Sequence, residues 1–143
     1  MGNKIAFLLI IINLSVVSCQ SVKTKTDNNE NSSFKNQFFS NPSVIYNLKK
    51  FVTGNQINIL DSKKLVTDKS LTFKNDIEDP TINIVTDKND FINYSIQQYT
   101  VNEDLAFVVI WEYGKNRALW FFLNKGKTNQ KWYLIEALER TTR

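Results

Sequence analysis

The spacing of hydrophobic residues changes along this chain, and each spacing predicts a different element. Between residues 42 and 52 the apolar side chains recur at helical period, at Val44, Ile45, Leu48, Phe51 and Val52. Asn41 is a favourable N-cap, Pro42 suits the first helical position, and Gly54 suits the residue just past a helix end. These signals predict an amphipathic helix whose apolar stripe packs on a sheet.

Two less regular segments flank this helix. Ser32 or Ser33 is expected to cap a short helix that holds Phe34, Phe38 and Phe39. Polar and apolar residues alternate from Gln56 to Ile59, which predicts a short strand. The later segments 64–69 and 84–88 share the letters Val-Thr-Asp-Lys, and both are interpreted as strand ends that run into turns.

From Thr81 onward the pattern is typical of consecutive strands separated by short turns. The expected strands cover residues 81–85, 91–101, 105–113, 117–125 and 130–138. The connections at 102–104, 114–116 and 126–129 each contain Gly or Asn, which hairpin turns favour because these residues tolerate positive φ. The pattern therefore predicts an antiparallel β-meander.

The last three expected strands are apolar on both faces. Leu105, Phe107, Val109, Trp111 and Tyr113 alternate with Ala106, Val108, Ile110 and Glu112, and the next two strands behave alike. An antiparallel sheet with one solvated face would instead alternate apolar with polar residues. Helices are expected on one face. A cavity, a partner chain or another sheet is expected on the other.

Composition limits the chemistry that this chain can carry out. It has 143 residues, no histidine and a single cysteine, Cys19. Histidine-based catalysis and histidine-ligated metals are therefore excluded. The net charge of +4 comes from scattered basic residues rather than a stripe, so nucleic acid is not an expected partner. No cofactor is expected, and the acidic loop 75–80 lacks the glycine and final Glu of a calcium-binding EF-hand.

The single cysteine follows a short positively charged segment and an apolar run. Lys4 precedes Ile5 to Ile12, and the run leads to Val16-Val17-Ser18-Cys19. The run is shorter than the roughly 20 residues that a membrane-spanning helix needs. The motif resembles the lipobox of bacterial lipoproteins, and the resemblance implies cleavage before Cys19 and acylation of its sulfur. A plain cleaved signal peptide and an uncleaved anchor are the alternatives.

This resemblance predicts the domain organisation and the location. Residues 1–18 would be the signal peptide, residues 19–33 the acylated Cys19 with a disordered tether, and residues 34–143 a single domain. Two or three acyl chains would hold the protein on a membrane. We expect the cell envelope, with an outer-membrane anchor that faces the periplasm.

The folded part is also similar to a known family. Two N-terminal helices followed by a meander that ends in Lys131-Trp132-Tyr133-Leu134-Ile135 look like small NTF2-like (cystatin-like) lipoproteins of unknown function from Bacteroidetes-type bacteria. The resemblance implies an α+β fold class, with N-terminal helices packed on a curved antiparallel β-meander. The His-Asp and Tyr-Asp pairs of that fold's enzymes have no matching motif in this chain.

Few residues stand out as site candidates besides Cys19, the lipidation site. Glu112 and Glu136 lie on otherwise apolar strand faces, where burial in a cavity would raise the pKa of either and make it a candidate acid or base. Each could also reach solvent from a strand end. The aromatic candidates for a binding surface are Trp111, Tyr113, Trp120 and Trp132, which could equally fill the core.

Two function hypotheses follow, beside a third, a structural spacer between membrane and wall, which fits the tether but leaves the apolar second face unexplained. The leading one is a lipid-anchored binding or interaction module of the periplasm or envelope, without catalysis. Its partner would be the membrane together with an envelope or secreted protein or a small apolar ligand. The alternative is an NTF2-like enzyme that uses Glu112 or Glu136 as a carboxylate general base in an apolar cavity.

Overall fold

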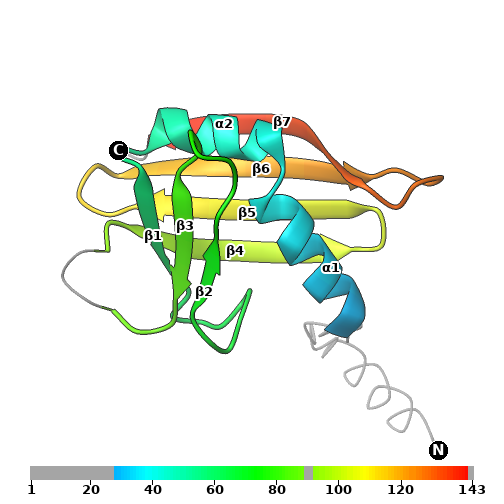
Figure 1. The fold of residues 1–143 in the computed structure, drawn as a ribbon, viewed down its shortest axis with the longest axis horizontal. Helices are drawn as coiled ribbons and strands as arrows, with labels where there is room; N and C mark the ends of the chain where they lie inside the picture. Colours follow the sequence, from blue (N-terminus) through cyan, green and yellow to red (C-terminus); the bar gives the residue numbers. More distant parts are fainter. Residues whose placement is uncertain (1–27, 89–91, 142–143) are drawn as a thin grey trace, which may run out of the picture.

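A computed structural model describes residues 28–88 and 92–141 and shows one seven-stranded sheet with two helices (Figure 1). The helices are α1 (Asn28–Phe39) and α2 (Pro42–Phe51). The strands are β1 (Gln56–Leu60), β2 (Leu71–Phe73), β3 (Thr81–Val85), β4 (Tyr94–Asn102), β5 (Leu105–Glu112), β6 (Arg117–Lys125) and β7 (Trp132–Thr141). Their order in the sheet is β2-β3-β1-β4-β5-β6-β7.

The predicted helix after Asn41 is confirmed as α2. The Asn41 side chain caps it by accepting a hydrogen bond of 2.9 Å from the backbone N–H of Ser43. Helix α1 begins at Asn28, earlier than the predicted cap at Ser32 or Ser33. Residues 28–33, expected in the tether, therefore form its first turns, whereas residues 1–27 lie outside the described residues.

The antiparallel pairing of the C-terminal strands is confirmed. β4 pairs with β5, β5 with β6, and β6 with β7, each through a short turn. A bulge between Leu134 and Glu136 of β7 breaks the strict alternation expected there, so Trp132, Leu134 and Ala137 all contribute to the core.

The predicted fold class was wrong. β3 does not continue into a meander, because it pairs in parallel with β1 and antiparallel with the edge strand β2. β1 then pairs in parallel with β4 as well. The protein is thus a β-rich mixed sheet, not helices on an NTF2-like antiparallel meander. Parallel partners lie far apart in sequence and have no shared turn to signal their pairing, so the sequence pattern missed them.

The hydrophobic core lies between β4–β7 and the elements that cross them. Figure 1 shows β1–β3 and both helices on the same side of the β4–β7 strands. The rings of Phe34, Phe38 and Phe39 on α1 are fully buried, and Phe38 meets Phe121 of β6 edge to face at 5.2 Å. Phe39 stacks on Phe73 of β2 at 4.8 Å. One face of β4–β7, called here the inner face, is therefore covered.

Candidate functional site: the outer face of the sheet

The opposite face of β5–β7 is rich in apolar residues. This outer face consists of Leu105, Phe107, Val109 and Trp111 on β5, Ala118, Trp120 and Phe122 on β6, and Tyr133 and Leu138 on β7. Strand register aligns these residues in rows: Val109 lies opposite Trp120, which lies opposite Leu138. Because side chains alternate across a strand, all of them point away from the helices.

Aromatic rings form the centre of the outer face. Phe107 stacks on Phe122 at 4.8 Å between ring centroids and meets Trp120 edge to face at 5.7 Å. Cross-strand aromatic pairs of this kind stabilise a sheet. The three rings are half-buried by one another, and Leu105 beside them is 56% exposed.

No helix or strand in residues 28–88 and 92–141 covers this surface. The same side of β1–β3 is polar: Asn83 lies at the centre of a row in which it donates to Asn58 at 2.9 Å and accepts from Thr72 at 2.9 Å. This side of the sheet therefore carries polar side chains on β1–β3 and apolar side chains on β5–β7. The expectation of two apolar faces on the last strands holds most clearly for β5 and β6.

The four aromatic candidates do not form one surface. Trp111 and Trp120 lie on the outer face and are half-buried. Tyr113 follows the end of β5, is 41% exposed, and has the Lys88 ammonium 5.8 Å from its ring. Trp132 points inward instead, where it is 4% exposed and contacts Phe34 edge to face at 4.7 Å.

Glu112 lies on the inner face and is 3% exposed. The Nε of Arg117 donates to its Oε2 at 2.7 Å, and the Nζ of Lys115 lies 2.9 Å from its Oε1. Burial by itself raises the pKa of Glu112, but the hydrogen bonds from Lys115 and Arg117 and their positive charges outweigh it and hold the pKa below the ordinary value. A carboxylate held in its ionised form in this way is a weak base.

Glu136 lies on the other side of the sheet. It is exposed and stands opposite Phe122 in the β6–β7 register. The two glutamates therefore point to opposite faces and cannot act on one substrate. Sequence reasoning also left out the residue that organises this region, Arg117, whose position just after a hairpin turn gave no hint of its partners.

A second residue without a sequence signal is Asp61, which directly follows β1. Its fully buried carboxylate accepts backbone hydrogen bonds from Leu65 at 2.8 Å, Val66 at 2.8 Å and Thr67 at 3.0 Å. Residues 64–69 are therefore a loop wrapped around Asp61 and not the strand end expected from Val-Thr-Asp-Lys.

Within the described ranges, no three His, Cys, Asp or Glu residues gather closely enough to hold a metal ion. In the acidic loop 75–80, Asp79 forms an ion pair of 2.7 Å with Lys49, while Asp76 and Glu78 are exposed. Neither α1 nor α2 has the length and apolar character that crossing a bilayer requires. Cys19, the expected lipidation site, lies outside the described residues. Comparison with protein-family models, curated proteins and solved structures found no match.

Proposed function

We propose that this protein is a lipid-anchored interaction module of the cell envelope that binds another protein through the outer face. The observation that carries the proposal is the aromatic cluster of Phe107, Trp120 and Phe122, which no described helix or strand covers. Exposed apolar patches of this kind mark interaction sites on monomeric proteins.

The distribution of charge supports the same reading. On β5 and β6 the outward positions carry no charged side chain. Charges appear only toward the edge strand β7, at Glu136 and Arg140. A centre depleted in charge and enriched in aromatic residues, with a polar rim, is the composition of protein–protein interfaces.

The shape of the face suits a protein better than a small molecule. Eight residues of β5 extend for about 26 Å, and the span from β4 to β7 adds about 14 Å in width. Three cavities among the described residues lie against α1, at the α1–α2 junction and at the hairpin tips, and Tyr133 is the one outer-face residue that lines any of these three. Small apolar ligands prefer concave sites, whereas this surface follows a sheet.

Acylation of Cys19 would place this surface at a membrane. Eight residues, 20–27, separate Cys19 from the start of α1, and a fully extended chain of that length reaches about 30 Å. The domain would therefore stay close to the membrane, where its partner would be another envelope protein or a protein that passes through the envelope.

Site-specific photo-crosslinking in cells tests the interaction. A crosslinking amino acid at Leu105, on the outer face, should give one discrete adduct that a further Tyr133→Lys change abolishes. Ile77 is the matched control because it is fully exposed on a loop away from the outer face. Equal adducts from both positions, or none from Leu105, would contradict the proposal. An adduct of twice the chain mass would identify a second copy as the partner.

The anchor is tested separately. Cys19→Ser should move the protein from the membrane to the aqueous fraction and abolish incorporation of labelled palmitate. Ser18→Ala is the control, because it keeps a small residue before the cysteine and should preserve both properties. Retention of the Cys19→Ser variant in the membrane would refute lipidation without affecting the interaction proposal.

No specific observation favours the enzyme alternative. Glu112 is held by Arg117 and Lys115, and Glu136 is exposed on the opposite face. Neither glutamate lines any of the three cavities described above.

A further inference from the structure

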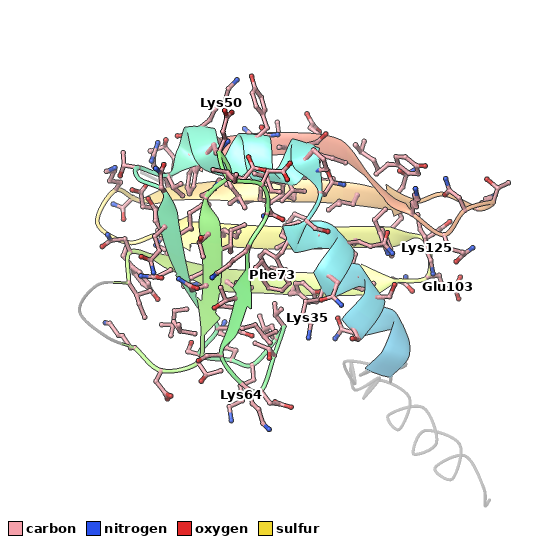
Figure 2. The ribbon with its side chains drawn as sticks, viewed as in Figure 1. Lys35, Lys50, Lys64, Phe73, Glu103 and Lys125 are labelled. Carbon is pink, nitrogen blue, oxygen red and sulfur yellow. The ribbon has the colours of Figure 1, made fainter. Side chains whose placement is uncertain are left out.

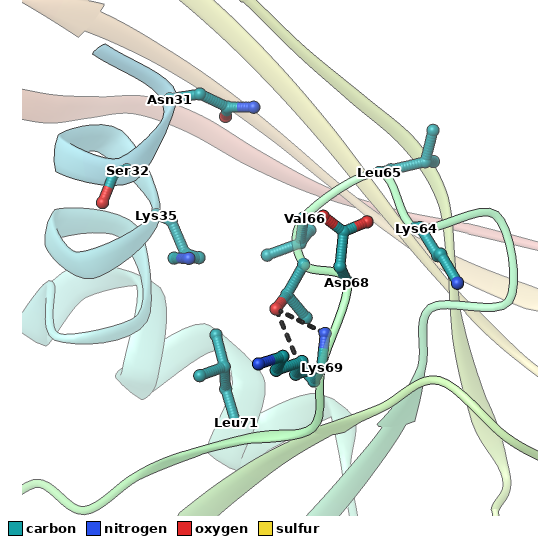
Figure 3. A pocket seen from close by; sticks show the side chains of 10 residues that line it. Asn31, Ser32, Lys35, Lys64, Leu65, Val66, Asp68, Lys69 and Leu71 are labelled. Atoms are coloured by element: carbon teal, nitrogen blue, oxygen red, sulfur yellow. Dashed lines mark hydrogen bonds between the residues drawn. The ribbon is translucent and has the colours of Figure 1, made fainter. Parts of the chain in front are cut away.

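A pocket of about 510 Å³ lies between α1 and the loop of residues 61–70, on the side of the sheet opposite to the outer face. Figure 3 shows its two walls: Asn31, Ser32 and Lys35 come from α1, while residues 64–69 come from the loop. Leu71, the first residue of β2, closes the base. The volume is within the usual range of small-ligand sites.

Two lysines extend into this space from opposite walls. Figure 3 shows Lys35 reaching from α1 and Lys69 reaching from the loop toward the gap between them, whereas Lys64 extends away from it. Among the described residues neither Lys35 nor Lys69 forms an ion pair. Asp68 also lines the pocket but pairs with neither of them. Neither ammonium group is therefore neutralised by an ion pair with a described residue, and the exposed carboxylate of Asp68 lies in the lining of the same pocket.

The loop wall is fixed before any ligand arrives. The buried carboxylate of Asp61 holds the backbone of residues 65–67, as described above. The Thr67 hydroxyl donates to the carbonyl of Lys69 at 2.7 Å and accepts from its N–H at 3.2 Å. A lysine carried on such a constrained backbone loses less conformational entropy on binding than one on a loose loop.

The α1 wall carries a buried polar atom that lacks a hydrogen-bond donor in the described part of the chain. The side-chain oxygen of Asn31 is buried and has no hydrogen-bond partner among the described residues. No hydrogen bond therefore holds this amide in one orientation, and its NH₂ group, a double donor, can turn toward a ligand oxygen. The unpaired oxygen is itself an acceptor that phosphate oxygens would not satisfy, so the NH₂ group of this amide is the part that would face the ligand.

We propose that this pocket binds a phosphate group, with Lys35 and Lys69 as its charged donors and the Asn31 amide as a neutral one. A phosphate monoester carries a charge between about −1.5 and −2 at neutral pH, which matches two lysines. Lysine binds phosphate as a point charge and needs no bidentate geometry. Aliphatic contacts from Val66 and Leu71 would pack against the ester portion of the ligand.

The phosphate could belong to a lipid headgroup or to a free ligand. Lys35 lies on α1, about two turns after the N-terminal end of that helix at Asn28 (Figure 2). Only residues 20–27 separate that end from Cys19. If Cys19 is acylated, headgroup phosphates lie within reach of the pocket. The site does not depend on the outer face, because its residues lie on the opposite side of the sheet. It does not depend on acylation either, because a free phosphate ligand needs no anchor to reach it.

Amide chemical shifts of the full chain in maltoside micelles, which carry no phosphate, provide the test. One arm titrates inorganic phosphate, and the other dopes the micelles with phosphatidylglycerol, with phosphatidylcholine as the lipid control. The charge-matched variants are Lys35→Gln/Lys69→Gln and Lys127→Gln/Lys131→Gln, the second pair being exposed around the β6–β7 turn. Unchanged shifts elsewhere in each spectrum show that the fold is intact.

Saturable shifts confined to residues 31–35 and 64–69 are expected in at least one arm. The Lys35→Gln/Lys69→Gln variant should bind about tenfold more weakly, while the control pair stays within about twofold. A response to phosphatidylglycerol alone assigns the site to a lipid headgroup, and a response to inorganic phosphate assigns it to a free ligand. No saturable shifts in either arm, or equal weakening by both variants, would overturn the proposal.

Discussion

Arg117 of β6 stands opposite Glu112 of β5 and donates a hydrogen bond of 2.7 Å from its Nε to the buried Oε2. The same guanidinium donates from its Nη1 to Glu139 of β7 and from its Nη2 to the carbonyl of Phe51, both at 2.9 Å. The central carbon of the guanidinium, Cζ, also lies 4.7 Å from the centre of the Phe51 ring. One side chain therefore connects three strands with the end of α2.

Replacing Arg117 should destabilise the protein strongly. Arg117→Met leaves the Glu112 carboxylate buried with Lys115 as its only remaining cation. Removing one partner of a buried pair costs about 3 kcal/mol or more in the free energy of unfolding, which urea denaturation measures. Glu139→Gln is the control: this carboxylate is 48% exposed, so its loss should cost under about 1 kcal/mol. Equal effects of the two variants would show that Glu112 does not need Arg117.

Stability should fall in acid because of Glu112. The pKa of Glu112 in the folded protein lies below its ordinary value of 4.5, so the folded state binds this proton less readily than the unfolded chain does. The contribution is fully present above pH 4.5 and is lost as the pH falls through the lower folded value. Unfolding free energies of the wild type and Glu112→Gln between pH 7 and pH 3 should therefore converge in acid. A difference independent of pH would contradict this origin.

Asp61 should be essential for the loop that follows β1. Asp61→Ala removes the acceptor of three backbone N–H groups, and each buried donor left unpaired costs about 1–3 kcal/mol. We expect a loss of about 3 kcal/mol or more and at least tenfold faster hydrogen exchange at residues 65–67. Asp61→Asn retains one acceptor oxygen and should cost less. The exposed Asp68→Ala serves as the control, and a comparable loss there would contradict the role given to Asp61.

Replacing Tyr99 by phenylalanine should not lower the stability of the protein at neutral pH. Its buried hydroxyl has no hydrogen-bond partner among the described residues, so Tyr99→Phe removes an unsatisfied polar group and should be neutral or stabilising by up to about 1 kcal/mol. Burial, with the Asp61 charge adding to it, raises the pKa of Tyr99 far above its ordinary value of 10.0.

Tyr99→Phe should also change how the stability of the protein depends on pH in alkaline solution. Above pH 10 the unfolded phenol ionises while the folded one stays neutral, so stability due to Tyr99 is present below pH 10 and lost above it. Denaturation midpoints between pH 8 and pH 11 should fall less steeply for Tyr99→Phe than for the wild type. A destabilised Tyr99→Phe at pH 7 would instead indicate a partner for the hydroxyl.

Local sequence signals determined the elements whose partners are near in the chain. The capping of α2 by Asn41 and the turns that join β4 to β7 depend on contacts within a few residues, so periodicity and Gly or Asn positions were enough to predict them. The apolar character of both faces of β5 and β6 was equally visible, because side-chain alternation is a property of the strand itself.

Contacts between residues far apart in the sequence decided the remaining features of the fold and of the candidate site. β1 lies between β3 and β4, Trp132 turns inward onto Phe34, and Glu112 meets Arg117 rather than solvent. Parallel pairing, the β7 bulge and the choice of which apolar face the helices cover depend on the free energy of the whole packed core. The sequence alone therefore determined that two faces of these strands are apolar. Only the tertiary structure decided which of the two faces α1, α2 and β1–β3 cover, because these elements can bury just one of them.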